Sequence, residues 1–127
     1  MDKRPEGKIT LAQAFRFAFC GMGRCVSSQR NMRIHIGAAV LVVMAGLVCG
    51  ISPAEWCTVV LCIGMVCALE CVNTAVEATV DLVTEEFHPL AKVAKDCAAG
   101  AVLIAALASV VVGLLVFVPA IARMCGL

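Results

Sequence analysis

Four segments of this chain carry a regular pattern of apolar positions, and short polar stretches separate them. In the first, over residues 9–29, apolar residues recur every three or four positions, while polar and basic residues lie opposite. This spacing predicts an amphipathic helix that lies in the membrane interface. The apolar stripe consists of Leu11, Phe15, Phe19, Met22 and Val26.

The other three segments are predominantly apolar and long enough to cross a membrane as helices. Pro53 and Pro89 each follow a short polar turn, and proline suits the first turn of a helix. The sequence therefore predicts an all-α membrane protein, with an N-terminal amphipathic interface helix followed by three transmembrane helices in a helix bundle. The expected spans are residues 31–51, 54–82 and 89–121.

The amino-acid composition agrees with this pattern. Of the 127 residues, 62% are hydrophobic and 15% charged, which is typical of a membrane protein. Three spans leave no room for a separate soluble module, so residues 1–127 are expected to form a single domain, with residues 1–8 as a tail. The net charge of +1 gives no bulk attraction for nucleic acid. The nine cysteines form no C-x-x-C motif and are interpreted as small apolar residues.

The basic residues are distributed unevenly between the two ends of the spans. Of the 10 lysines and arginines, seven lie before or at the start of the first span and two at the start of the third, so only Arg123 lies at the opposite ends of the spans. Short segments rich in Lys and Arg remain in the cytoplasm when a membrane protein inserts. The N-terminus and the second connection are therefore predicted to be cytoplasmic.

The second span ends in the stretch ECVNTAVEATVD, which runs from Glu70 to Asp81. At ~100° per residue, Glu70, Glu77 and Asp81 fall on one stripe of the helix, and Asn73 lies beside it. An acidic residue at the centre of a span costs ~2.5–3.5 kcal/mol on insertion scales. Carboxylates at such a depth therefore require a partner or a function.

The depth of this stripe follows from its distance to the start of the helix. At 1.5 Å per residue, Glu70 lies ~25 Å from Pro53, and Asp81 lies ~42 Å from it. In a hydrocarbon core ~30 Å thick, Glu70 falls within the far leaflet and Asp81 emerges into water. The stripe is therefore expected to open toward the cytosol, where a soluble reagent meets lipid head groups.

Three functions fit the stripe. Carboxylates that hold a divalent cation, together with nearby Lys and Arg, can support phosphoryl transfer to a lipid. Intramembrane glutamates can also relay protons in a small proton- or cation-coupled transporter. In the third case the carboxylates merely pair with basic residues of neighbouring helices. The sequence has neither the G-x-x-x-x-G-K-[ST] nor the G-x-G-x-x-G nucleotide-binding motif.

Residues 70–103 resemble the prokaryotic diacylglycerol kinase family of small three-span membrane kinases. The matching signature is E-x-x-N-[ST]-A-x-E-x-x-x-D followed by A-K-D, and the similarity covers nearly the whole chain, including the R-N-M-R-I-H entry to the first span. Within the family, the sequence looks most like the undecaprenol kinases of Gram-positive bacteria. The resemblance implies a homotrimer in the bacterial plasma membrane that uses ATP and Mg²⁺ to phosphorylate a lipid alcohol. It favours undecaprenol, with diacylglycerol as the alternative, and implies active sites shared between subunits.

The resemblance also implies a role for each residue of the stripe. Glu70 matches the proposed general base of the family, Glu77 its principal metal-binding carboxylate, and Asn73 its positioning amide. On the nucleotide side, Lys95 matches the lysine that contacts the transferring phosphates, and Asp96 matches its partner. Asp81 matches the acidic residue at the exit of the helix.

Position 29 departs from the family pattern. Family members usually carry a metal-binding glutamate just before the R-N-M-R run, and this chain has Gln29. A glutamine offers one neutral amide oxygen where a glutamate offers charge. Gln29 is therefore a candidate for the metal or nucleotide site, with weaker metal binding expected.

Overall fold

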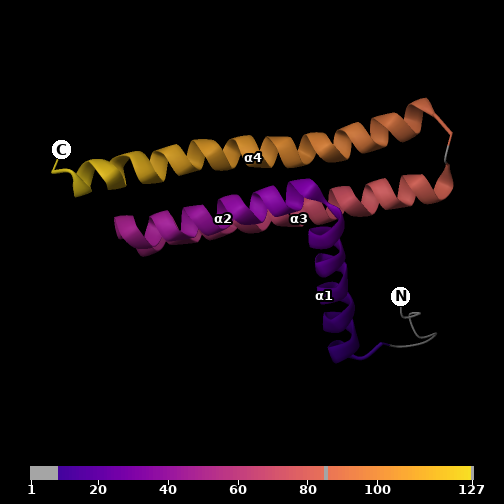
Figure 1. Ribbon diagram of the computed structural model, residues 1–127, viewed down its shortest axis with the longest axis horizontal. Helices are drawn as coiled ribbons and strands as arrows, with labels where there is room; N and C mark the ends of the chain where they lie inside the picture. Colours follow the sequence, from indigo (N-terminus) through magenta and orange to yellow (C-terminus); the bar gives the residue numbers. More distant parts are fainter. Residues whose placement is uncertain (1–8, 85, 127) are drawn as a thin grey trace.

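The computed structural model describes residues 9–84 and 86–126, and within these ranges the chain forms four helices (Figure 1). The predicted tail, residues 1–8, lies outside the described residues. Three of the helices are long and apolar enough to cross a membrane, which confirms the expected all-α membrane fold. The helices are α1 (Leu11–Ser28), α2 (Arg30–Cys49), α3 (Pro53–Val83) and α4 (Pro89–Met124).

Short polar motifs set where the helices begin and end. Thr10 and Gln13 form a capping box at the start of α1, in which Gln13 Oε1 accepts a hydrogen bond from the Thr10 N–H at 2.8 Å. Ser52 and Glu55 form the same arrangement at the start of α3. Between α2 and α3, Gly50 has a φ of +59°, in the left-handed region that glycine adopts without strain.

A single non-helical residue, Gln29, separates α1 from α2. Its backbone is extended, with φ −101° and ψ 120°, so the chain changes direction at this point. Figure 1 shows the result, in which α1 runs across the direction of the other three helices. All five residues of the apolar stripe on α1 are exposed, as suits a helix that lies on a membrane surface.

Among the membrane helices, α3 and α4 pack together most extensively, and α2 contacts both. A buried cluster of Ile51, Val59, Val116 and Ala120 forms the core at the end of the bundle away from the connection between α3 and α4. The last helix continues through Pro119 to Met124, beyond the predicted end at residue 121. Buried Ala120 and an ion pair between Arg123 and Glu55, at 3.5 Å, explain this extension because they hold the last turn against α3.

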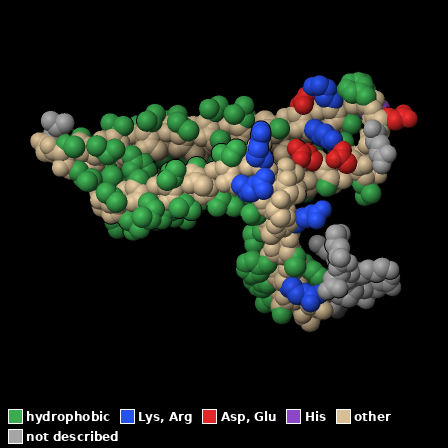
Figure 2. All heavy atoms as spheres, viewed as in Figure 1, with side chains coloured by type: hydrophobic (Ala, Val, Ile, Leu, Met, Phe, Trp, Pro, Cys, Tyr) green, Lys and Arg blue, Asp and Glu red, His purple; other side chains and the backbone are tan. Residues whose placement is uncertain are grey.

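Charged side chains gather toward the opposite end of the molecule. Figure 2 shows basic side chains over α1, and both basic and acidic side chains over the ends of α3 and α4 that meet at their connection. The other half of the visible face is covered by hydrophobic side chains. The polar stripe of α3 therefore lies in the charged half of the bundle.

The turn between α2 and α3 depends on a close approach at Gly46. A Cβ placed on Gly46 would lie 2.8 Å from Cη2 of Trp56, whereas a Cβ on Gly37 of the same helix would meet nothing within 4 Å. We expect Gly46→Ala to lower the free energy of unfolding by about 1–3 kcal/mol through overpacking. Thermal unfolding in detergent, with Gly37→Ala as the matched control, measures this effect. Equal melting temperatures for the two variants would contradict the packing at Gly46.

Candidate active site

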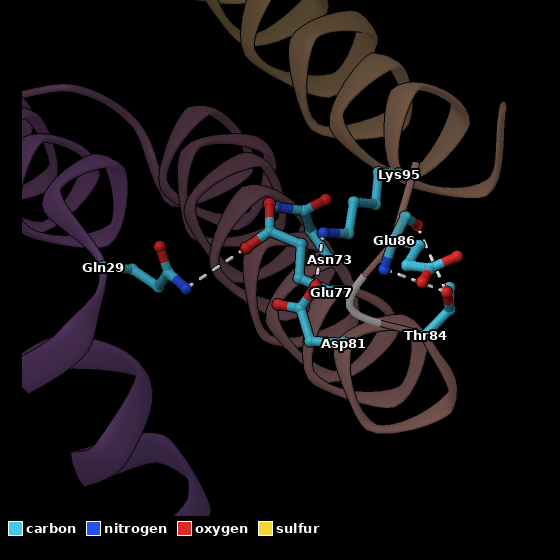
Figure 3. A network of polar contacts seen from close by, with 7 residues as sticks. All are labelled: Gln29, Asn73, Glu77, Asp81, Thr84, Glu86 and Lys95. Atoms are coloured by element: carbon cyan, nitrogen blue, oxygen red, sulfur yellow. Dashed lines mark hydrogen bonds and ion pairs between the residues drawn. The ribbon is translucent and has the colours of Figure 1, made fainter. Parts of the chain in front are cut away.

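Three predicted site residues meet through side-chain hydrogen bonds in the C-terminal half of α3. Gln29 Nε2 donates to Oε2 of Glu77 at 3.3 Å, and Asn73 Nδ2 donates to Oε1 of Glu77 at 3.1 Å. Figure 3 shows Gln29 reaching from the junction of α1 and α2 to the carboxylate on α3. Because the helix breaks at Gln29, the side-chain amide of this residue reaches the polar stripe of α3.

Glu70 lies deeper, and it is almost completely buried. Its exposed fraction is 1%, and its carboxylate makes no hydrogen bond to any of the described residues. Glu70 lines a cavity of about 240 Å³ together with Asn73 of α3 and two polar residues of α2, Asn31 and His35. The remaining walls are apolar and come mostly from α4, namely Ile34, Ala99, Val102, Leu103 and Ala106.

Asn73 joins this cavity to the network around Glu77. Its amide nitrogen donates a hydrogen bond to Glu77, while its Oδ1 is buried and has no hydrogen-bond partner within the described part of the chain. A buried carbonyl oxygen without a partner costs about 1–3 kcal/mol, so it marks a place where a ligand group can bind. Asn73 thus offers a hydrogen-bond acceptor between Glu70, the candidate general base, and the carboxylate of Glu77.

The outer end of the stripe faces α4. Lys95 Nζ forms an ion pair with Oδ1 of Asp81, and Lys92 pairs with Asp96 one turn apart on α4. All four residues line a cavity of about 630 Å³ beside the connection between α3 and α4. These pairs are substantially exposed, so they contribute little to stability and are free to exchange partners with an anionic ligand.

A thiol holds α1 against the stripe. Cys25 is buried, and its Sγ lies 3.1 Å from Oγ1 of Thr74. The Cys25 thiol and the Thr74 hydroxyl both reach the backbone carbonyl of Glu70, at 3.9 Å from the sulfur and 2.8 Å from the hydroxyl oxygen. The contact fixes α1 directly behind the turn of α3 that carries Glu70.

The oxygen donors around Glu77 fit a hard divalent cation. Glu77 supplies a carboxylate, and the amides of Gln29 and Asn73, whose nitrogens face Glu77 here, also carry oxygens of the type that Mg²⁺ and Ca²⁺ prefer. Within the described residues, no group of three or more His, Cys, Asp and Glu side chains is placed to hold a metal by itself. Magnesium is commonly bound through one or two carboxylates plus phosphates of the substrate, which is the arrangement this donor set suits.

The structure thus gathers the predicted residues into two groups on one face of the bundle. Glu70, Asn73, Glu77 and Gln29 form the inner group, whereas Lys95, Asp81 and Asp96 lie around the outer cavity.

Asn31, His35 and Cys25 were not among the predicted site residues. The first two are one helical turn apart, so their spacing placed them on one face of α2, but nothing in the pattern showed that this face meets Glu70. Cys25 carried no distinguishing signal.

Together, the three apolar helices, a buried carboxylate, and a set of cations and oxygen donors at one end of the bundle fit a membrane enzyme that acts on a lipid. The family model of prokaryotic diacylglycerol kinase matches residues 16–117 of the chain. The protein belongs to this family and is a membrane lipid kinase. As a kinase it uses ATP, and this chemistry typically requires a divalent metal.

Two similar proteins refine the comparison. The undecaprenol kinase of Bacillus subtilis (strain 168) is 44% identical over 107 residues, which cover 84% of this chain and 87% of that protein. A diacylglycerol kinase of Synechocystis sp. is 44% identical over 104 residues, which cover 81% of this chain and 59% of that protein. The similarity therefore includes relatives named for two different lipid substrates.

The Cys25 contact predicts how firmly α1 is held. Cys25→Ala removes the thiol that contacts Thr74 and the Glu70 carbonyl, and it leaves a void at the contact between α1 and α3. We expect amide hydrogen exchange in α1 to become about fivefold faster or more, since local opening costs less. Cys20→Ala, at an exposed position of the same helix, is the matched control. Equal exchange rates in the two variants would show that Cys25 does not anchor α1.

Proposed function

We propose that this protein transfers the γ-phosphoryl group of ATP to the hydroxyl of undecaprenol, giving undecaprenyl phosphate, and that Glu70 is the general base. The observation that carries this assignment is the position of Glu70, which is buried and unpaired by the described residues within a mostly apolar cavity. The choice of undecaprenol is supported by the similarity to the undecaprenol kinase of Bacillus subtilis, which extends over most of both chains. Diacylglycerol is the alternative substrate, and the Synechocystis relative supports it.

The proposed reaction is a direct in-line transfer. The hydroxyl oxygen of the lipid forms a bond to the γ-phosphorus while the bond from that phosphorus to the β,γ-bridging oxygen breaks, and ADP leaves. Glu70 accepts the hydroxyl proton, and the unpartnered Oδ1 of Asn73 is available to orient the hydroxyl or a phosphate-side group. The apolar residues that line the cavity around Glu70 limit the access of water, which otherwise competes with the lipid as acceptor.

The nucleotide is proposed to bind at the outer group. Lys95 exchanges its ion pair with Asp81 for the phosphates and neutralises charge on the transferring group. Asp96, released from Lys92 in the same way, faces the nucleotide side. The cavity beside these residues, about 630 Å³ in volume, is large enough for a nucleotide.

The metal proposed for this site is Mg²⁺, held by Glu77 and by the amide oxygen of Gln29. Rotation of the Gln29 amide by ~180° exchanges the nitrogen that now faces Glu77 for the oxygen. When bound, the ion neutralises charge on the β- and γ-phosphates.

We further propose that the functional unit is a homotrimer with its N-terminus in the cytoplasm. The described residues of one chain supply too few ligands for a complete metal site, which supports a contribution from phosphates and a neighbouring copy. On α4, the small residues Ala98, Ala101, Ala105 and Ala108 recur at helical spacing and allow close helix approach. The cytoplasmic orientation is supported by the basic residues, which lie almost entirely at one end of the spans.

Substituting the two glutamates separately distinguishes catalysis from structure. Glu70→Gln removes the base, so we expect kcat to fall about a hundredfold or more while nucleotide binding is retained. Glu77→Gln removes a metal ligand, so we expect weaker Mg²⁺-dependent nucleotide binding as well as lower activity. Transfer of labelled phosphate from ATP and fluorescence binding of an ATP analogue measure the two effects. Variants that keep full activity and lose only thermal stability would assign both carboxylates to structural ion pairs.

The lipid substrate is decided by competition. Protein in lipid nanodiscs, supplied with labelled ATP, Mg²⁺ and equal mole fractions of undecaprenol and diacylglycerol, is expected to label undecaprenol preferentially. Preferential labelling of diacylglycerol would establish the alternative substrate. Absence of transfer to any lipid alcohol, together with proton or cation flux in liposomes, would favour a transporter.

Gln29→Glu tests the amide at the metal site. A second carboxylate beside Glu77 raises the negative charge that faces the cation, so we expect the Mg²⁺ concentration for half-maximal activity to fall about tenfold. Gln13→Glu, which keeps the capping box at the distant end of α1, is the matched control. An unchanged Mg²⁺ requirement in Gln29→Glu would remove position 29 from the metal site.

A further inference from the structure

His35 is an ionisable residue inside the first membrane-spanning helix, and the reaction steps described above do not use it. It lies in the second turn of α2, and its side chain is half-buried. Ionisable side chains within spans are energetically costly, and those that occur usually face a cavity, a charged partner or a proton pathway. The position of His35 therefore calls for a functional explanation.

His35 shares a cavity with Glu70. The polar part of this cavity, about 240 Å³ in volume, consists of Asn31 and His35 of α2 and of Glu70 and Asn73 of α3. His35 also lines an apolar groove of about 270 Å³ between α2, α3 and α4. Among the described residues that line these two spaces, Glu70 is the one carboxylic acid and His35 the one basic group.

The proton that Glu70 receives has to leave before the next transfer. Each transfer breaks the O–H bond of one lipid alcohol, so one proton reaches Glu70 and one is released to water in every turnover. Glu70 is 1% exposed, and its carboxylate makes no hydrogen bond to any of the described residues. A basic group beside Glu70 would therefore speed its return to the carboxylate form.

The chemistry of the other lining residues leaves His35 as the acceptor. The amides of Asn31 and Asn73 are not basic, and the thiols of Cys62 and Cys67, which line the groove, can lose a proton but do not gain one. Among the described residues, α4 contributes no ionisable side chain to either space. An imidazole, in contrast, binds and releases a proton near neutral pH.

We propose that His35 accepts the proton from Glu70 after phosphoryl transfer and passes it to the cytosolic side. The proposal rests on the general-base role proposed above for Glu70. The O–H bond of the Glu70 carboxylic acid breaks as a ring nitrogen of His35 gains the proton, directly or through one water molecule held by the polar groups of the cavity. The imidazolium then loses the proton to water at the level of Asn31, which is exposed and lies one helical turn nearer the start of α2.

This route keeps the net charge inside the span low. When His35 takes the proton, the products are a carboxylate and an imidazolium, which attract each other and together carry no net charge. A paired charge is tolerated in a medium of low dielectric constant far better than an isolated one. Glu70 thus regains the form that can accept the next hydroxyl proton.

His35→Ala tests the proton transfer through activity. It removes the acceptor and leaves Glu70 in place, so we expect kcat to fall about tenfold or more, with the KM for undecaprenol and for ATP unchanged. Added imidazole, which fits the space left by the side chain, should raise kcat of this variant severalfold and leave wild type unchanged. In His35→Phe the ring fills that space, so kcat should fall without rescue. Val40→Ala, at an exposed position of the same helix, is the matched control and should keep kcat.

Three outcomes of this experiment would overturn the proposal. They are an unchanged kcat in His35→Ala, a loss of kcat that imidazole does not restore, and a higher KM for the lipid with kcat unchanged, which would make His35 a substrate contact instead. The proposed general base fails separately. Full activity in Glu70→Gln would refute it, whereas an inactive Glu70→Gln beside a fully active His35→Ala would refute only the role of His35.

Nitrogen NMR gives a readout that requires no activity and keeps His35 in place. The ¹⁵N chemical shifts of the His35 ring report its protonation and hydrogen bonding, so they should change in Glu70→Gln. Glu77→Gln is the matched control, since Glu77 lies on the same stripe but does not line the cavity, and it should leave these shifts as in wild type. Identical His35 shifts in wild type and Glu70→Gln would overturn the proposal.

Discussion

The free-energy cost of placing Glu70 inside a membrane helix constrains most of this structure. A buried carboxylate without a partner is tolerated only where neighbouring elements enclose it and a ligand can reach it. Here α2 and α4 supply the enclosing walls of its cavity, and α1 covers the back of the same turn of α3 through Cys25. The direction change at Gln29 is what allows α1 to reach that position.

Much of the fold could be predicted from local sequence. The apolar period on α1, the length of the three apolar runs and the helix starts at Pro53 and Pro89 are all local signals, and the observed helices follow them. The last turn of α4, which runs on to Met124, is held by contacts of Ala120 and Arg123 with other parts of the chain. Such contacts are not encoded in the neighbourhood of Pro119.

The candidate site was predictable to a smaller extent. The spacing of Glu70, Glu77 and Asp81 placed them on one face of α3. The sequence did not show which of these carboxylates are buried and which lie at the surface. That depends on how far α2 extends along α3 and on the position at which α1 ends, next to Gln29. Asn31 and His35 became apparent only once the packing of α2 against Glu70 was known.

The buried core and the polar residues occupy opposite ends of the bundle. Ile51, Val59, Val116 and Ala120 secure one end, while the stripe and its two cavities occupy the other. The cluster around Ile51 is therefore remote from the stripe, whereas Cys25 and Val102 are buried beside it. Substitutions in that cluster can change the packing of the bundle without contacting the polar residues, but substitutions of Cys25 or Val102 change packing and site together.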